Sequence, residues 1–174
     1  MVLLLIALLP WAAYASELAS LEPQAHISQY QCEIITQYEH LHEISINYGD
    51  ILLNEDEINI FHASKAVVES FDTVMSELKA MDVPGQMDEP HQILIKSVNS
   101  YTQSARYVQK ALGIFIGEYD GNENDTLEHI DKGKKQVVLG NKYLAQSQDM
   151  YEKLFVLDGE VSKSCKKYVE AISY

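Results

Sequence analysis

Apolar residues recur at a seven-residue period along most of this chain. The clearest pattern lies between residues 90 and 119, where two apolar rows alternate at steps of four and three residues. This spacing places both rows on one face of a helix and is typical of the seam of a packed helical bundle. The two rows are Leu94, Tyr101, Val108 and Phe115, and Val98, Ala105, Leu112 and Tyr119.

Three further stretches repeat the same period. We expect helices over about residues 23–53, 55–82, 90–119 and 126–157. Asn54 followed by Glu57 resembles a capping box, and Pro90 suits the first turn of a helix. The rows in the other three helices are Ile27, Ile34, Leu41 and Tyr48; Ile60, Val67, Val74 and Met81; and Ile130, Val137, Leu144 and Tyr151.

Four long helices joined by short connections predict an all-α fold, an up-down-up-down four-helix bundle. A short C-terminal helical tail is expected at residues 160–174, after Asp158 and Gly159. The chain has 174 residues, which suits one domain, and we expect that domain at residues 16–174. The first and fourth helices would then be antiparallel neighbours.

Residues 1–15 read MVLLLIALLPWAAYA and end in a small-x-small pattern, Ala13-Tyr14-Ala15. The segment predicts a signal peptide cleaved after Ala15, and therefore a secreted, cell-surface or periplasmic protein. No Lys or Arg precedes the apolar run, so a short retained anchor is the alternative. The run is shorter than the roughly 20 residues that a membrane-spanning helix needs. No membrane span is expected in the mature chain.

Two cysteines, Cys32 and Cys165, remain after the predicted cleavage site. An even number of cysteines in an exported protein predicts a disulfide. In an up-down-up-down bundle the start of the first helix lies near the end of the fourth, which brings Cys32 within reach of the tail. In a reducing environment the two residues would instead be free thiols.

The net charge of -13 disfavours some classes of binding partner. So acidic a surface repels phosphate backbones and anionic bilayers, which disfavours nucleic-acid binding and membrane-surface binding. The charge is also unevenly placed, because residues 1–64 contain nine acids and no Lys or Arg. We interpret most of this charge as a solvated surface that keeps the protein soluble.

The second apolar row of the fourth helix is interrupted by polar residues. If this row faces the core, Lys134, Asn141 and Gln148 form an interior polar layer that could line a ligand cavity. In the alternative, the helix is rotated and Val138 and Ala145 face inward. The full row is Leu127, Lys134, Asn141, Gln148 and Phe155.

Other candidate chemistry is sparse. Glu39 and His42 form a Glu-x-x-His, an element of di-iron bundles, but the second copy that such a site needs is absent. Haem-attachment, phosphate-loop and nucleophile-elbow motifs are absent as well. We therefore expect a non-enzymatic protein without a cofactor. Asn124 begins an Asn-Asp-Thr acceptor for N-glycosylation.

One stretch resembles a loose family of small exported helical-bundle proteins and lipoproteins of bacteria and archaea. The resemblance implies a fold and an exported location but no activity, and the chain lacks the lipid-anchoring cysteine of the lipoproteins. The residues that carry it are Val83-Pro84, His91, Leu94, Tyr101, Ala105 and Gly140-Asn141.

The combined expectation is an exported bundle that binds a protein partner or a small ligand outside the cytoplasm. Two alternatives remain open. One is an extracytoplasmic, sensor-like ligand-binding domain, and the other is a metal- or redox-binding four-helix bundle.

Overall fold

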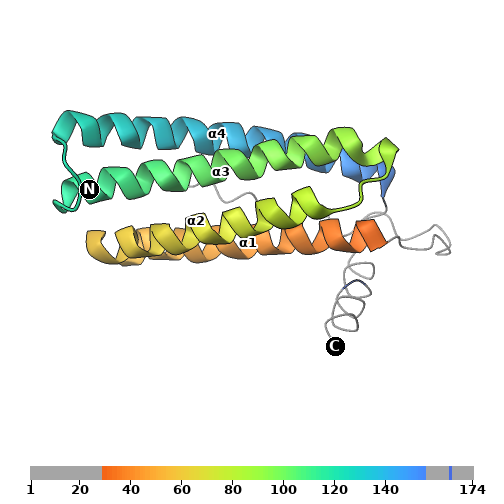
Figure 1. Cartoon of the computed structure of the whole chain (residues 1–174), viewed down its shortest axis with the longest axis horizontal. Coiled ribbons are helices and arrows are strands. Elements are labelled where there is room, and N and C mark those ends of the chain that lie inside the picture. The colour runs from red at the N-terminus through yellow and green to blue at the C-terminus, as the bar shows by residue number, and fades with distance from the viewer. Residues whose placement is uncertain (1–28, 156–164, 166–174) are drawn as a thin grey trace.

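The computed structural model of this chain describes residues 29–155 and Cys165, and this part is all-α. Consecutive helices run in opposite directions and pack against one another as a four-helix bundle (Figure 1). The predicted signal peptide, and the predicted tail except Cys165, lie outside the described residues. The helices are α1 (Gln29–Asn54), α2 (Glu57–Ala80), α3 (Asp88–Phe115) and α4 (Glu123–Leu154), with a short 3-10 turn, η2 (Gly85–Met87), before α3.

Side-chain caps begin α2 and α4, and the cap of α2 differs from the one that the sequence suggested. Asp56, rather than Asn54, caps α2, and its side chain accepts a hydrogen bond from the Asn59 backbone N–H at 2.9 Å. Asn122 caps α4 in a reciprocal capping box with Asp125. These side chains satisfy backbone N–H groups that have no partner within the helix. They set the starts of α2 and α4 at one end of the bundle.

Small residues join α3 to α4. The Ser97 hydroxyl donates to the Gly140 carbonyl at 2.9 Å, and the Ser104 hydroxyl donates to the Gly133 carbonyl at 3.0 Å. Successive contacts therefore move seven residues forward along α3 and seven residues back along α4, as expected for an antiparallel pair. Side chains this short let two helix backbones approach closely. The hydroxyls also have partners although both serines are buried.

Long side chains, by contrast, join α1 to α4. The backbones of these two helices are farther apart than those of α3 and α4. Tyr38 donates from its hydroxyl to Ser147 at 2.9 Å, and its ring meets that of Tyr151 edge-on. Tyr30 contacts Tyr151 and Phe155 in the same region. The predicted contact between the first and fourth helices is therefore made through tyrosines rather than through closely packed backbones.

The two ends of the bundle are different. We call one the loop end and define it as residues 50–59 and 115–127, which contain the turns between α1 and α2 and between α3 and α4 (left in Figure 1). We call the other the closed end and define it by Tyr30, Leu78, His91 and Tyr151, where α1 and α3 begin and α2 and α4 finish.

Candidate functional site

The closed end is held by a chain of buried hydrogen bonds that touches all four helices. His91, at the start of α3, lies 2.9 Å through Nε2 from the Leu78 carbonyl at the end of α2. Its Nδ1 lies 3.0 Å from the Tyr30 hydroxyl of α1, which in turn lies 2.7 Å from the Tyr151 hydroxyl of α4. These residues are buried, so each polar group needs the partner that it has here.

The partners fix the direction of each hydrogen bond. A carbonyl oxygen only accepts, so Nε2 of His91 carries the proton and donates to Leu78. Nδ1 of the neutral ring must then accept from the Tyr30 hydroxyl, which leaves Tyr30 to accept from Tyr151. Removal from water lowers the pKa of His91 below its usual value, despite the opposing effects of the Leu78 carbonyl and Asp88. The lowered pKa favours the neutral ring, and the hydrogen-bond directions given above are those of that form.

Tyrosine hydroxyls at this end are also poor acids. Burial raises the pKa of Tyr30 to about 12 and raises the pKa of Tyr151 and Tyr38 further. A catalytic acid or base that works near neutral pH needs a pKa near that range. The closed end consequently has the properties of a structural network, and it offers no activated nucleophile among these groups.

Cys32 and Cys165 form a disulfide next to this network. The two sulfur atoms lie 2.14 Å apart, and both residues are buried. This confirms the pairing expected from the sequence. Cys32 lies two residues after Tyr30 on α1, so the bond ties a distant part of the chain to the closed end.

The polar row of α4 does not form an interior layer. Lys134 is exposed, whereas Asn141 and Gln148 are half-buried, and Asn141 accepts a hydrogen bond from Tyr101 at 2.7 Å. The rotated alternative is also wrong, because Val138 is 69% exposed and Ala145 is exposed. The residues that actually face the interior of the bundle are Gly133, Gly140, Leu144, Ser147 and Tyr151.

The remaining candidate residues lie on α1 and at the start of α4. Glu39 is half-buried and His42 is exposed on α1. Within residues 29–155 and Cys165, no group of three His, Cys, Asp or Glu side chains is placed to hold a metal ion. Asn124 is exposed in the first turn of α4, where its side chain is accessible. The described helices also include none that is long and apolar enough to cross a bilayer.

The loop end exposes apolar side chains from rows that are buried elsewhere. Along one row of α3, Leu94 is 0% exposed, Val108 remains buried, and Phe115 is 65% exposed. Burial also decreases along the row of α4 toward the loop end. Tyr151 is buried, whereas Val137 and Ile130 are half-buried. Beyond them, Leu127 is 56% exposed. The seam of the bundle thus opens toward solvent at this end.

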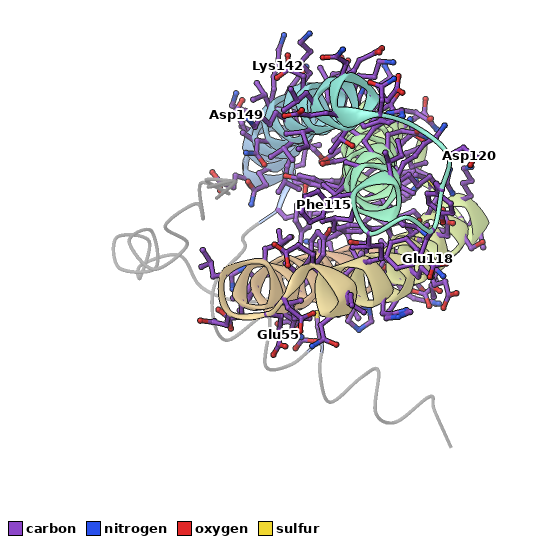
Figure 2. The ribbon with its side chains drawn as sticks, turned by 90° about the vertical axis from the view of Figure 1, so that its left-hand side faces the viewer. Glu55, Phe115, Glu118, Asp120, Lys142 and Asp149 are labelled. Atoms are coloured by element: carbon purple, nitrogen blue, oxygen red, sulfur yellow. A yellow bond between two sulfur atoms is a disulfide. The ribbon has the colours of Figure 1, made fainter. Side chains whose placement is uncertain are left out.

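Both helical hairpins contribute to this opening. Leu53 and Ile58, on either side of the turn between α1 and α2, are exposed. Tyr119 is partly exposed and covers Gly113 of α3, and its ring meets that of Phe61 from α2 edge-on with centroids 5.7 Å apart. Figure 2 looks onto this end and shows Phe115 between the two hairpins. We call Leu53, Ile58, Phe115, Tyr119 and Leu127 the apolar end patch.

Acidic residues are concentrated at the loop end, near the apolar end patch. Residues 50–59 and 115–127 contain eight Asp or Glu and no Lys or Arg. Four of the acids lie at helix starts, where they cap or favour the helix N-terminus. Glu118 and Asp120 do not, and in the described part of the chain their carboxylates have no hydrogen-bond or ion-pair partner. In Figure 2, Glu118 and Asp120 lie to the right of Phe115, and Glu55 lies below the hairpin of α1 and α2.

Sequence reasoning placed Phe115 and Tyr119 in the seam and so missed the apolar end patch. A heptad row states which side chains share a helix face, but not whether a neighbouring helix covers them. One signal was present: the two predicted turns at this end are rich in acids and lack bases. Comparisons of the chain with protein-family models, curated proteins and solved structures found no match.

Proposed function

We propose that this protein is a non-enzymatic binding protein that acts outside the cytoplasm and recognises a protein partner through its loop end. The observation that carries the proposal is the change in burial along one row of α3, from Leu94 to Phe115. Single exposed apolar residues are ordinary on protein surfaces. Five at one end, contributed by both hairpins, are typical of a surface that another molecule covers.

A protein partner suits this surface better than a small ligand. Small-molecule sites are concave and combine apolar walls with a few converging polar groups. The apolar end patch instead extends over the ends of four helices and has a polar, charged border. An apolar centre with a polar rim is the usual anatomy of a protein–protein interface.

Two observations support a location outside the cytoplasm. Residues 1–15 have the apolar run and the small-x-small end of a secretory signal. The disulfide between Cys32 and Cys165 is of a kind that persists mainly in oxidising compartments. The intact mass of protein exported by its own host tests this point, and we expect residues 16–174 in the oxidised form. Protein retained in the cytoplasm with free thiols would contradict it.

Site-specific photo-crosslinking in the host tests the binding surface. A benzophenone amino acid is placed at Phe115 in one variant and at Val138 in another, because both side chains are apolar and similarly exposed, at 65% and 69%. The proposal expects a covalent adduct with one other protein from position 115 and none from position 138. Equal adducts from both positions, or no adduct from 115, would overturn it. A crosslink from position 115 to residues 1–28 of the same chain would also overturn the proposal.

A further inference from the structure

We infer that the partner docks at the loop end through a positively charged, amphipathic helix that lies over the apolar end patch. This inference rests on the proposed function and adds the chemical class of the partner. It follows from two features of the loop end: the spacing of the apolar residues that are uncovered, and the sign of the charge around them.

The spacing favours a helix over an extended strand. On α3, Phe115 prolongs the row in which Val108 is buried, and on α4 Ile130 and Val137 prolong the row of Leu144 at seven-residue steps. Rows with this spacing accept the side chains of another helix between them. A strand would need a free sheet edge to pair with, and the described part of the chain contains no strand.

The charge at the loop end selects a cationic partner. Eight acids and no Lys or Arg lie within residues 50–59 and 115–127. The carboxylates of Glu118 and Asp120, which flank Tyr119, are exposed and have no partner in the described part of the chain. Lys and Arg on the polar face of a docked helix would meet these groups at the rim, where complementary charge sets specificity and the rate of association.

The same charge argues against a second copy of this chain as the occupant. A symmetric dimer through two loop ends would bring one set of eight acids against another. Like charges placed opposite each other across an interface are unfavourable and suppress wrong partners. An anionic lipid surface is disfavoured for the same reason.

Three synthetic peptides of equal length test the inference against the oxidised full-length chain. The first is a three-heptad amphipathic helix with leucines on one face and lysines on the other. The second replaces each lysine by glutamate, and the third scrambles the first so that its charge is kept but its apolar face is lost. Affinities are measured by fluorescence anisotropy at low and high salt. We expect the first peptide to bind well, and the other two to bind at least about tenfold more weakly.

Variants then locate the site. Phe115→Ala should weaken the first peptide about tenfold, because the central apolar contact is lost. The double variant E118Q/D120N should weaken it about threefold at low salt and less at high salt, because exposed charges are screened. The control E69Q/D82N removes the same number of exposed acids away from the loop end and should leave the affinity unchanged.

The outcomes separate the inference from the proposed function. If the glutamate peptide binds as tightly as the lysine peptide, or if the scrambled peptide does, the cationic helix is wrong. If the lysine peptide binds Phe115→Ala and the parent chain equally, its site is elsewhere and the inference is overturned. A crosslinked partner at position 115 would still support the proposed function in either case. Absence of that adduct would count against the proposed function itself.

Discussion

The closed end and the loop end of this bundle are built from the same helices and the same apolar rows, yet they differ in what those rows contact. At the closed end, His91 and Tyr30 connect all four helices, and Leu94 is completely buried. At the loop end, Phe115 is the last member of the row that contains Leu94, and it is mostly exposed. A regular sequence pattern therefore yields a sealed core at one end and an open surface at the other.

The difference has a local cause in the way α4 is attached. Glycine and serine hold α4 close to α3 over much of its length. Its contacts with α1, in contrast, are made by Tyr30 and Tyr38 in the half of the bundle near the closed end. The closed end is thus fastened by long side chains that span from α1 to α4. Burial depends on that bridging as much as on the periodicity of each helix.

The largest expected effect comes from the disulfide, which stabilises the closed end. The bond joins residues 133 positions apart, so its removal restores much conformational freedom to the unfolded chain. We expect C32S/C165S to lower the free energy of unfolding by roughly 3–5 kcal/mol. Urea denaturation followed by circular dichroism measures the change. An unaltered midpoint would show that the closed end does not depend on this bond.

A smaller loss is expected from Tyr30→Phe. The variant leaves Nδ1 of His91 without a donor and the hydroxyl of Tyr151 without an acceptor. Two buried groups without partners should cost roughly 2–3 kcal/mol of stability. Tyr143→Phe is the matched control, because Tyr143 is a half-buried tyrosine outside the network, and it should change stability by about 0.5 kcal/mol or less. Equal losses in both variants would argue against a special role for the network.

Two glycines of α4 test how closely α3 and α4 approach. A Cβ at Gly140 would lie 2.8 Å from the ring of Tyr101, which stacks on Phe71, so Gly140→Ala should lower stability by about 1–3 kcal/mol. At Gly133 a Cβ would meet its nearest neighbour at 3.5 Å, an ordinary contact. Gly133→Ala should therefore be neutral or stabilise the helix by up to about 1 kcal/mol. Thermal unfolding of both variants measures the two changes in stability. A larger loss for Gly133→Ala than for Gly140→Ala would contradict the close approach of α3 and α4 at Gly140.

The pH dependence of the closed end gives the smallest effect. Burial lowers the pKa of His91, so below the unfolded value of about 6.5 the unfolded chain binds a proton that the folded chain does not. Stability should therefore fall as pH decreases from about 6.5 toward the folded pKa, by at most about 1.4 kcal/mol per pH unit. Above a pH of about 6.5, the contribution of His91 to stability should be constant. Comparison with His91→Gln isolates the effect, and identical pH slopes in both proteins would exclude His91 as its source.

The sequence was sufficient for the fold because its evidence is local. Heptad rows such as Ile34 with Leu41 and Val67 with Val74 are buried as the period predicts, and each row lies within a single helix. The rotation of α4 was misjudged because its inner face is marked by Gly133, Gly140 and Ser147, which an apolar pattern does not register. A row of small residues at seven-residue steps was nevertheless present and could have been found.

The candidate sites were harder to predict because they depend on contacts between helices. His91 meets Tyr30 from a position 61 residues away, and Tyr30 meets Tyr151 across 121 residues. Nothing in the local sequence of any of the three specifies these pairs. The exposure of Phe115 is likewise set by which helices cover it. The heptad pattern placed Phe115 in a row of α3 with Leu94 and Val108 but did not specify whether a neighbouring helix covers it.

The difference between the two ends of the bundle is tested most directly by comparing Leu94→Ala with Phe115→Ala in urea denaturation. Both residues belong to one row of α3, but Leu94 is 0% exposed and Phe115 is 65% exposed. We predict that Leu94→Ala lowers the free energy of unfolding by about 2–5 kcal/mol, and that Phe115→Ala lowers it by about 1 kcal/mol or less. That result would show that Phe115 is not needed for folding and is free to contact a partner. Equal, large losses would place Phe115 in the core and contradict the account.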